Sequence, residues 1–213
     1  MQLVIPPSRQ RRSLGVHLSG IIRCIAQESG ILKPEWAEEL SLVDTRLITD
    51  PVAITRICMG LAWEEWYIES QLPEVIDHPG EMLLDGIYMT HDGEELITLI
   101  VDGRSRHVSK LHEIKLTYKS MRTIGVADEA YDSTESPVGP LSNQWMWMAQ
   151  TKGYCKAAMT RFVDLHVLFV CGDYSYPLQP KAWRYSIEFT QEEIDQNWAL
   201  MTDYHQTFLQ DKA

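Results

Sequence analysis

A change of periodicity between residues 51 and 118 constrains the fold of this chain more than any other feature. Residues 51 to about 70 place apolar side chains at helical intervals, and Pro51 is favourable in a first helical turn. Residues 81–118 instead form short β-rich runs, which the turn signals Asp92-Gly93 and Asp102-Gly103 separate. We therefore expect a helix followed by a three-stranded meander.

The rest of the chain continues to mix the two element types. Helical spacing recurs over residues 14–28 and 143–160, although Gly153 weakens the second of these helices. Thr190 and Glu193 form a capping box that opens a last helix. Two further runs, residues 163–171 and 183–189, have the pattern of strands. Residues 124–143 have the composition of a surface loop. The order predicts a mixed α/β (α+β) fold.

The domain organisation follows from the absence of repeats and linkers. We expect a single domain over residues 1–213, with a helical amino-terminal region (1–50), a core (51–190) and a carboxy-terminal helix (191–213). No run approaches the roughly 20 apolar residues that a bilayer requires, so we expect no membrane span. Four cysteines lie far apart without a CxxC pair or a signal peptide, which indicates neither a zinc site nor a disulfide framework. A cytoplasmic location follows as an expectation.

The charge is unevenly distributed. The net charge of −11 gives a poor overall field for attracting nucleic acid. Between Arg104 and Arg161, however, nine basic and five acidic residues give +4, which leaves −15 for the remainder. A positive strip on an acidic body can meet a polyanion locally, although a scattered solvated surface would have the same composition.

Glu113 and Lys115 stand two residues apart in a β-rich run, so both lie on one strand face while Ile114 faces the other. A solvated ion pair would explain these two residues alone. Asp85 favours a metal site over a solvated ion pair. Its neighbours are apolar, and a carboxylate among apolar side chains is costly unless it binds a partner. A glycine follows it. Two converging carboxylates would form an oxygen-rich pocket that suits Mg²⁺, with the lysine placed to position a water molecule.

These residues resemble the motifs of the PD-(D/E)XK nuclease superfamily, in the branch of RecB-type nuclease domains, Cas4 proteins and phage lambda-type exonucleases. The motifs are Asp85, then Glu113-Ile114-Lys115, then Gln150 and Tyr154, which share a helix face. Gly60 and Glu64 match a further motif in the helix before the meander. The element order also resembles the restriction-endonuclease-like αβββαβ core of that family, a mixed central sheet flanked by helices.

The resemblance implies a role for each matched residue. Asp85, Glu113 and Glu64 would bind the metal together with the carbonyl of Ile114, and Lys115 would serve the nucleophilic water; Glu65 is an alternative to Glu64. Gln150 and Tyr154 would hold DNA. The cofactor would be Mg²⁺, for which Mn²⁺ can substitute. The iron–sulfur cysteines of some relatives are missing, so we expect no iron–sulfur cluster.

The function implied is a Mg²⁺-dependent deoxyribonuclease that leaves 5′-phosphates, an exonuclease on linear double-stranded DNA in phage-type recombination or repair. Its partners would be DNA, a recombination or single-strand-annealing protein and further copies of the chain, in a bacterial or phage-infected host cytoplasm. A structure- or sequence-specific endonuclease of the same fold is one alternative. A non-catalytic interaction module, whose motif residues form structural ion pairs, is the other.

Several residues outside the motifs have less specific interpretations. Arg12 and Ser19 could grip a terminal phosphate, and Lys152 with Lys156 could contact backbone phosphates. His112 faces away from Glu113 and is expected to be structural. The sequence predicts an exposed turn at His91. Four apolar residues are expected to pack their helix: Trp145, Met146, Trp147 and Met148.

Overall fold

The structure is a computed structural model that describes residues 13, 15–32, 51–72, 76–77, 81–124, 141 and 143–210. Its main sheet has five strands in the order β2-β5-β6-β7-β8, and only β6 and β7 pair in parallel. These strands are β2 (Ile76–Asp77), β5 (Gly93–Val101), β6 (Arg104–Thr117), β7 (Phe162–Phe169) and β8 (Lys181–Glu188). A helix, α4 (Trp145–Ala157), makes the crossover that parallel neighbours require.

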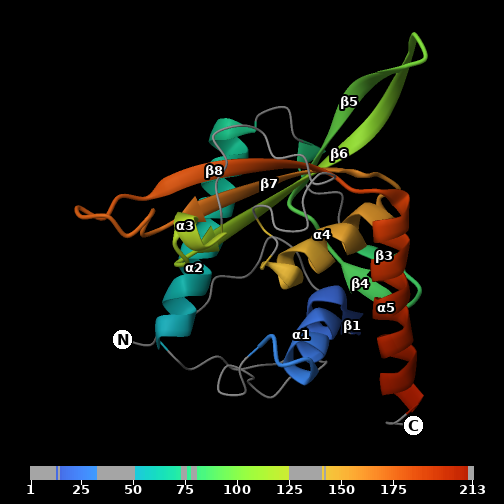
Figure 1. Cartoon of the computed structure of the whole chain (residues 1–213), viewed down its shortest axis with the longest axis horizontal. Helices are drawn as coiled ribbons and strands as arrows, with labels where there is room; N and C mark the ends of the chain where they lie inside the picture. Colours follow the sequence, from blue (N-terminus) through green and yellow to red (C-terminus); the bar gives the residue numbers. More distant parts are fainter. Residues whose placement is uncertain are drawn as a thin grey trace.

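Helices cover both faces of this sheet (Figure 1). On one face α2 (Pro51–Gln71) contacts β6, and on the other face α4 contacts β6 and β7. Two more helices, α1 (Leu18–Glu28) and α5 (Gln191–Gln210), pack on α4, and a one-turn helix, α3 (Met121–Ile124), follows β6. The mixed α/β fold class is thus confirmed. Along the chain α2, β2, β5, β6, α4 and β7 occur in this order, with two short strands between β2 and β5 and with α3 between β6 and α4.

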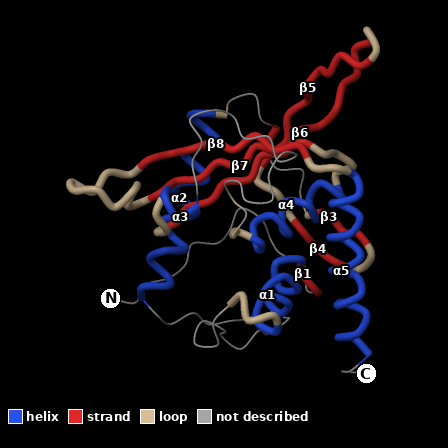
Figure 2. Tube along the Cα trace, viewed as in Figure 1, coloured by secondary structure: helices blue, strands red, loops and turns tan. Residues whose placement is uncertain are grey.

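A small second sheet replaces the first strand of the expected meander. It has the order β1-β4-β3, formed by β1 (Val16–His17), β3 (Met82–Leu84) and β4 (Ile87–Met89) (Figure 2). Asp85 and Gly86 form the two-residue turn between β3 and β4, and both have positive φ, 51° and 79°. Asp-Gly is a favoured pair for such a turn, and it breaks the run that the sequence pattern treated as one strand.

Other element boundaries agree with the sequence pattern in most places. The first helix begins at Leu18 instead of residue 14, because Val16 and His17 pair with β4. The capping box is present: the Glu193 amide donates to Thr190 Oγ1 at 3.2 Å, and the Thr190 amide donates to Glu193 Oε2 at 2.9 Å. Most of the expected loop 124–143 lies outside the described residues. No described helix is long and apolar enough to cross a membrane.

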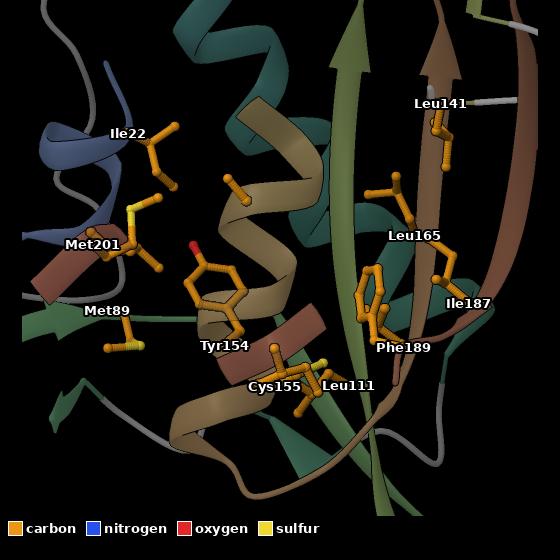
Figure 3. Packing of buried hydrophobic residues seen from close by; sticks show 14 of the residues in the cluster. Ile22, Met89, Leu111, Leu141, Tyr154, Cys155, Leu165, Ile187, Phe189 and Met201 are labelled. Carbon is orange, nitrogen blue, oxygen red and sulfur yellow. The ribbon is translucent and has the colours of Figure 1, made fainter. Parts of the chain in front are cut away.

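The hydrophobic core lies on both sides of α4. Toward the sheet it contains Leu165 and Phe189, and toward α1, α5 and the small sheet it contains Ile22, Met89 and Met201 (Figure 3). Tyr154, from α4, points among this second group. The expectation that four apolar residues of α4 pack their helix is confirmed, because all four lie against this core: Trp145, Met146, Trp147 and Met148. The helix that carries two of the candidate site residues is therefore held on both sides.

Gly153 offers a test of this packing. In an open helix a Gly→Ala change stabilises by about 0.5–1 kcal/mol. At position 153, however, an added Cβ would collide with the side chain of Leu18, where α1 crosses α4. We expect Gly153→Ala to lower the free energy of unfolding by about 1–3 kcal/mol, measured by urea denaturation. The matched control is Gly60→Ala, in α2, where a Cβ would meet no atom within 4 Å and the change should stabilise. Equal effects of the two substitutions would contradict this packing.

Candidate metal-dependent active site

The candidate site lies where β5 stops pairing with β6. The pairing runs from Val101 opposite Arg104 to Gly93 opposite His112, so residues 113–117 of β6 pair with β7 on one edge and not with β5 on the other. Within this segment Glu113 is 3% exposed, and Lys115 Nζ donates a hydrogen bond to its Oε1. The alternation of strand side chains places both residues on one face, as the sequence predicts, and the hydrogen bond from Lys115 to Gln150 identifies it as the α4 face.

Asp92 reaches the open edge from the residue just before β5. One of its carboxylate oxygens accepts a hydrogen bond from the backbone N–H of Ile114, and its own N–H donates to the carbonyl of His112 at 3.2 Å. In an extended strand the N–H and C=O of one residue point to the same edge. The carbonyl of Ile114 therefore also points to the open edge, which agrees with the ligand role that the resemblance gave it.

Three carboxyl groups lie close enough to one ammonium group to influence its pKa. Asp92 has a pKa well above its usual range because of burial and the charges of Glu113 and Glu64, which outweigh Lys115 and the Ile114 N–H. Burial alone would lower the pKa of Lys115, but the carboxylates of Glu113, Asp92 and Glu64 outweigh it and raise that pKa. Lys115 stays charged, and the cluster still carries more negative than positive charge. Such a cluster favours a cation.

Of the two candidate acids in α2, the structure brings Glu64 to the cluster. Glu64 is half-buried and close enough to influence the pKa of both Asp92 and Lys115. Glu65, one residue on, is exposed. Since α2 lies on one face of the sheet and Glu113 points to the other, the two carboxylates approach the open edge of β6 from opposite sides.

The third motif joins the same cluster from α4. Lys115 Nζ donates a second hydrogen bond to Gln150 Oε1 at 3.1 Å, and Gln150 Nε2 donates to the hydroxyl of Tyr154. Gln150 and Tyr154 are four residues apart, so they lie on one helix face, as predicted. Tyr154 is only 5% exposed, and its ring lies 6.3 Å from that of His91. His91 is fully buried, so the expectation of an exposed turn there was wrong.

Asp85 is not part of this cluster, which corrects the sequence assignment. Its carboxylate was expected in mid-strand among apolar side chains, where it would need a ligand. It lies instead in the exposed turn between β3 and β4, and its Oδ2 accepts a hydrogen bond from Trp198 Nε1 of α5 at 2.8 Å. Asp92 occupies the position beside Glu113 that was assigned to Asp85.

A sequence signal for Asp92 was available. The Asp102-Gly103 turn was recognised, and a two-residue turn there pairs Val101 with Arg104. Counting outward from that pair brings Asp92 opposite Glu113. The Asp92-Gly93 dipeptide was instead interpreted as a turn, because it has the same composition as the two dipeptides that do form turns, Asp85-Gly86 and Asp102-Gly103.

The remaining predicted binding residues lie apart from the cluster. Lys152 Nζ is 3.3 Å from Glu193 Oε1, and Lys156 Nζ is 2.7 Å from Asp195 Oδ1, so both lysines face α5. Residues two apart on a helix do not share a face, so Lys152 cannot accompany Gln150. Ser19 is half-buried in the first turn of α1. Arg12 lies outside the described residues.

The cluster suits a divalent cation on its own evidence. Glu113 Oε2 is buried and has no hydrogen-bond partner among the described residues. An unpaired carboxylate oxygen is expensive in a protein interior, and carboxylate and carbonyl oxygens are the ligands that Mg²⁺ prefers. Asp92, Glu113, Glu64 and the carbonyl of Ile114 together supply that donor set.

Comparisons with known proteins add no functional information. No family model matches the chain, and no curated protein matches it. Among solved structures, one described as "Crystal structure of SSO0001" matches with a TM-score of 0.38 and 13% identity, over 91% of this chain and 78% of that chain. A similarity of this size carries no argument, so the function is inferred from the geometry of the site.

The electrostatics of Asp92 lead to a stability prediction. Because its pKa in the folded protein lies above the ordinary value of 3.8, the folded state holds a proton that the unfolded chain releases. The metal-free protein should therefore lose stability as the pH rises from about 4 toward the folded pKa. Asp92→Asn removes this loss, keeps an acceptor for the Ile114 N–H, and should raise Tm at neutral pH with a chelator by about 2–4 °C.

Thermal melts with and without Mg²⁺ measure this effect. Mg²⁺ should stabilise the wild type and have little effect on Asp92→Asn, because a ligand stabilises only the state that binds it. Asp85→Asn is the matched control: it keeps the acceptor for Trp198 and should leave the pH dependence unchanged. A lower neutral-pH Tm for Asp92→Asn in chelator would show that the three carboxyl groups do not repel one another as described.

Proposed function

We propose that this chain is a Mg²⁺-dependent deoxyribonuclease that hydrolyses phosphodiester bonds and leaves 5′-phosphates. The observation that carries the proposal is the meeting of Asp92, Glu113, Glu64 and Lys115 at the open edge of β6, with one buried Glu113 oxygen left unpaired. An ion pair with only a structural role would need neither the extra carboxyl groups nor a free oxygen. The arrangement therefore supports a catalytic reading over a non-catalytic interaction module.

Each residue of the cluster would have its own role in hydrolysis. Asp92, Glu113, Glu64 and the Ile114 carbonyl would hold the ion, which when bound would supply Lewis-acid activation of water and phosphate. Lys115 would orient the attacking water and offset the charge that builds on the phosphate oxygens. The water oxygen bonds to phosphorus, the bond to the 3′ oxygen breaks, and that oxygen takes up a proton. The products are a 5′-phosphate and a 3′-hydroxyl.

Gln150 and Tyr154 would help to position the substrate strand. Gln150 already accepts from Lys115, so its amide fixes the direction of the ammonium group. Tyr154 is almost fully buried and receives a hydrogen bond from Gln150, so it supports Gln150 more than it presents a surface to DNA. We propose Gln150 as the residue of this pair that approaches the scissile phosphate.

We expect Lys115→Ala to reduce cleavage of DNA in Mg²⁺ or Mn²⁺ by about 100-fold or more, because a positioned group of this kind contributes about 10²–10⁴-fold. Asp92→Ala should abolish activity as well. Asp85→Ala is the decisive control, because the sequence motif and the geometry disagree about it: activity should remain near that of the wild type. If activity is lost in Asp85→Ala but kept in Asp92→Ala, the site described here is refuted. If the wild type cleaves neither DNA nor RNA with either metal, the proposal of nuclease activity is refuted.

The mode of cleavage requires a separate experiment. The resemblance favours an exonuclease on linear double-stranded DNA, acting in recombination or repair with an annealing partner and as a homo-oligomer. We expect the protein to degrade linear duplex to short products in Mg²⁺ while a covalently closed circle of the same sequence stays intact. Lys115→Ala protein, assayed in parallel, excludes a contaminating nuclease. Cutting of the closed circle would instead identify an endonuclease.

A further inference from the structure

A second cluster of ligating side chains lies on the opposite face of the sheet. His112 of β6 pairs in register with Asp164 of β7, and His166 follows two residues later on β7, so all three side chains point to the α2 face. They are 2%, 1% and 2% exposed. One potential ligand atom from each lies within 4.8 Å of the others. None of these residues takes part in the carboxylate cluster around Lys115.

The two imidazoles are oriented as metal ligands usually are. His112 Nδ1 and His166 Nε2 form a hydrogen bond to each other at 2.9 Å, and the second nitrogen of each ring lies near an oxygen atom, which forms a hydrogen bond with His166 but not with His112. The hydroxyl of Tyr67, from α2, lies 3.1 Å from His166 Nδ1, and Glu95 Oε1 lies 3.5 Å from His112 Nε2. Metal-bound histidines commonly donate their second N–H to such oxygens, which fixes the tautomer and the ring.

Asp164 supplies an independent observation. Both of its carboxylate oxygens are buried without a partner of hydrogen-bond geometry among the described residues, although Ser186 lies nearby on β8. Lys110 Nζ forms an ion pair with Oδ2 at 2.8 Å, whereas Oδ1 has no ion-pair partner among the described residues. Lys110 also pairs with Glu95, so the two carboxylates share one half-buried ammonium group. The exposed Arg184 lies at 4.0 Å from Asp164 Oδ2.

We propose that His112, Asp164 and His166 form a second metal site that takes zinc or a similar transition-metal ion. Two neutral imidazole nitrogens and one carboxylate oxygen suit Zn²⁺ and its neighbours, whereas Mg²⁺ prefers oxygen ligands alone. The two faces of β6 would thus hold different ions: Mg²⁺ beside Glu113 and a transition metal beside His112. The inference is independent of any nuclease activity, since such an ion would bind between β6 and β7 and stabilise their pairing.

Metal analysis of the whole purified chain tests the proposal. The chelator-treated protein is loaded with Zn²⁺ and dialysed against excess Mg²⁺, and zinc is then measured by elemental analysis. We expect about one equivalent of zinc in the wild type and in Asp92→Asn and Glu113→Gln, but a small fraction of this in His166→Gln and Asp164→Asn. Loading with Co²⁺ gives a second readout, because nitrogen ligands in a four-coordinate site produce strong visible absorption that an all-oxygen site lacks.

Each outcome decides for or against the site. If zinc is lost in Glu113→Gln but remains in His166→Gln, the ion binds at the carboxylate cluster. If the wild type binds no zinc, the histidines form only a hydrogen-bonded network. Either result overturns the proposal. Circular dichroism of the metal-free proteins shows whether the variants fold. If His166→Gln does not, Tyr67→Phe decides, because it removes the hydroxyl that lies 3.1 Å from His166 Nδ1, and the loss of an outer partner should weaken zinc binding by about 10–100-fold. An unchanged affinity in Tyr67→Phe would then count against the site.

Discussion

The register of the β5–β6 hairpin is the constraint on which the candidate active site depends. The Asp102-Gly103 turn fixes which residues face each other, and the pairing ends with Gly93 opposite His112. One residue further, the chain leaves the sheet, so Asp92 can turn its carboxylate onto the free N–H of Ile114. A shift of β5 by one residue against β6 would take the Asp92 carboxylate away from the Ile114 N–H. The turn at Asp102-Gly103 thus determines the surroundings of Glu113 and Lys115, although it lies at the far end of the hairpin.

The site is held in an arrangement that the metal-free chain does not favour. Three carboxyl groups share one ammonium group, and a buried Glu113 oxygen lacks a partner among the described residues. This repulsion is stable only because rigid elements carry each group: α2 carries Glu64, the sheet carries Asp92 and Glu113, and α4 packs between the sheet and α1. Preorganised repulsion of this kind is the feature that gives a cation its affinity. At this edge, an arrangement that suits a cation would therefore lower the stability of the metal-free chain.

The sequence predicted those parts of the site that depend on local geometry. The strand alternation of Glu113 and Lys115 and the helix spacing of Gln150 and Tyr154 need only the period of one element, and both are confirmed. The choice of aspartate depended on contacts between elements and was wrong. Three Asp-Gly pairs look alike in the sequence, and only the strand pairing shows that two are turns and that Asp92 is not. His91 was misjudged for the same reason, since its burial comes from α4.

The histidine cluster shows a limit of a different kind. Alternation places His112 on the face opposite Glu113, and it places Asp164 and His166 on one face of β7, but nothing in either strand alone says that these faces meet. The crossover through α4 connects the two strands, and its length and packing determine which residue of β7 lies opposite each residue of β6. The fold class needs only the order of the elements, whereas each site needs the register between two strands. This difference explains why the fold was predicted more completely than the chemistry that it supports.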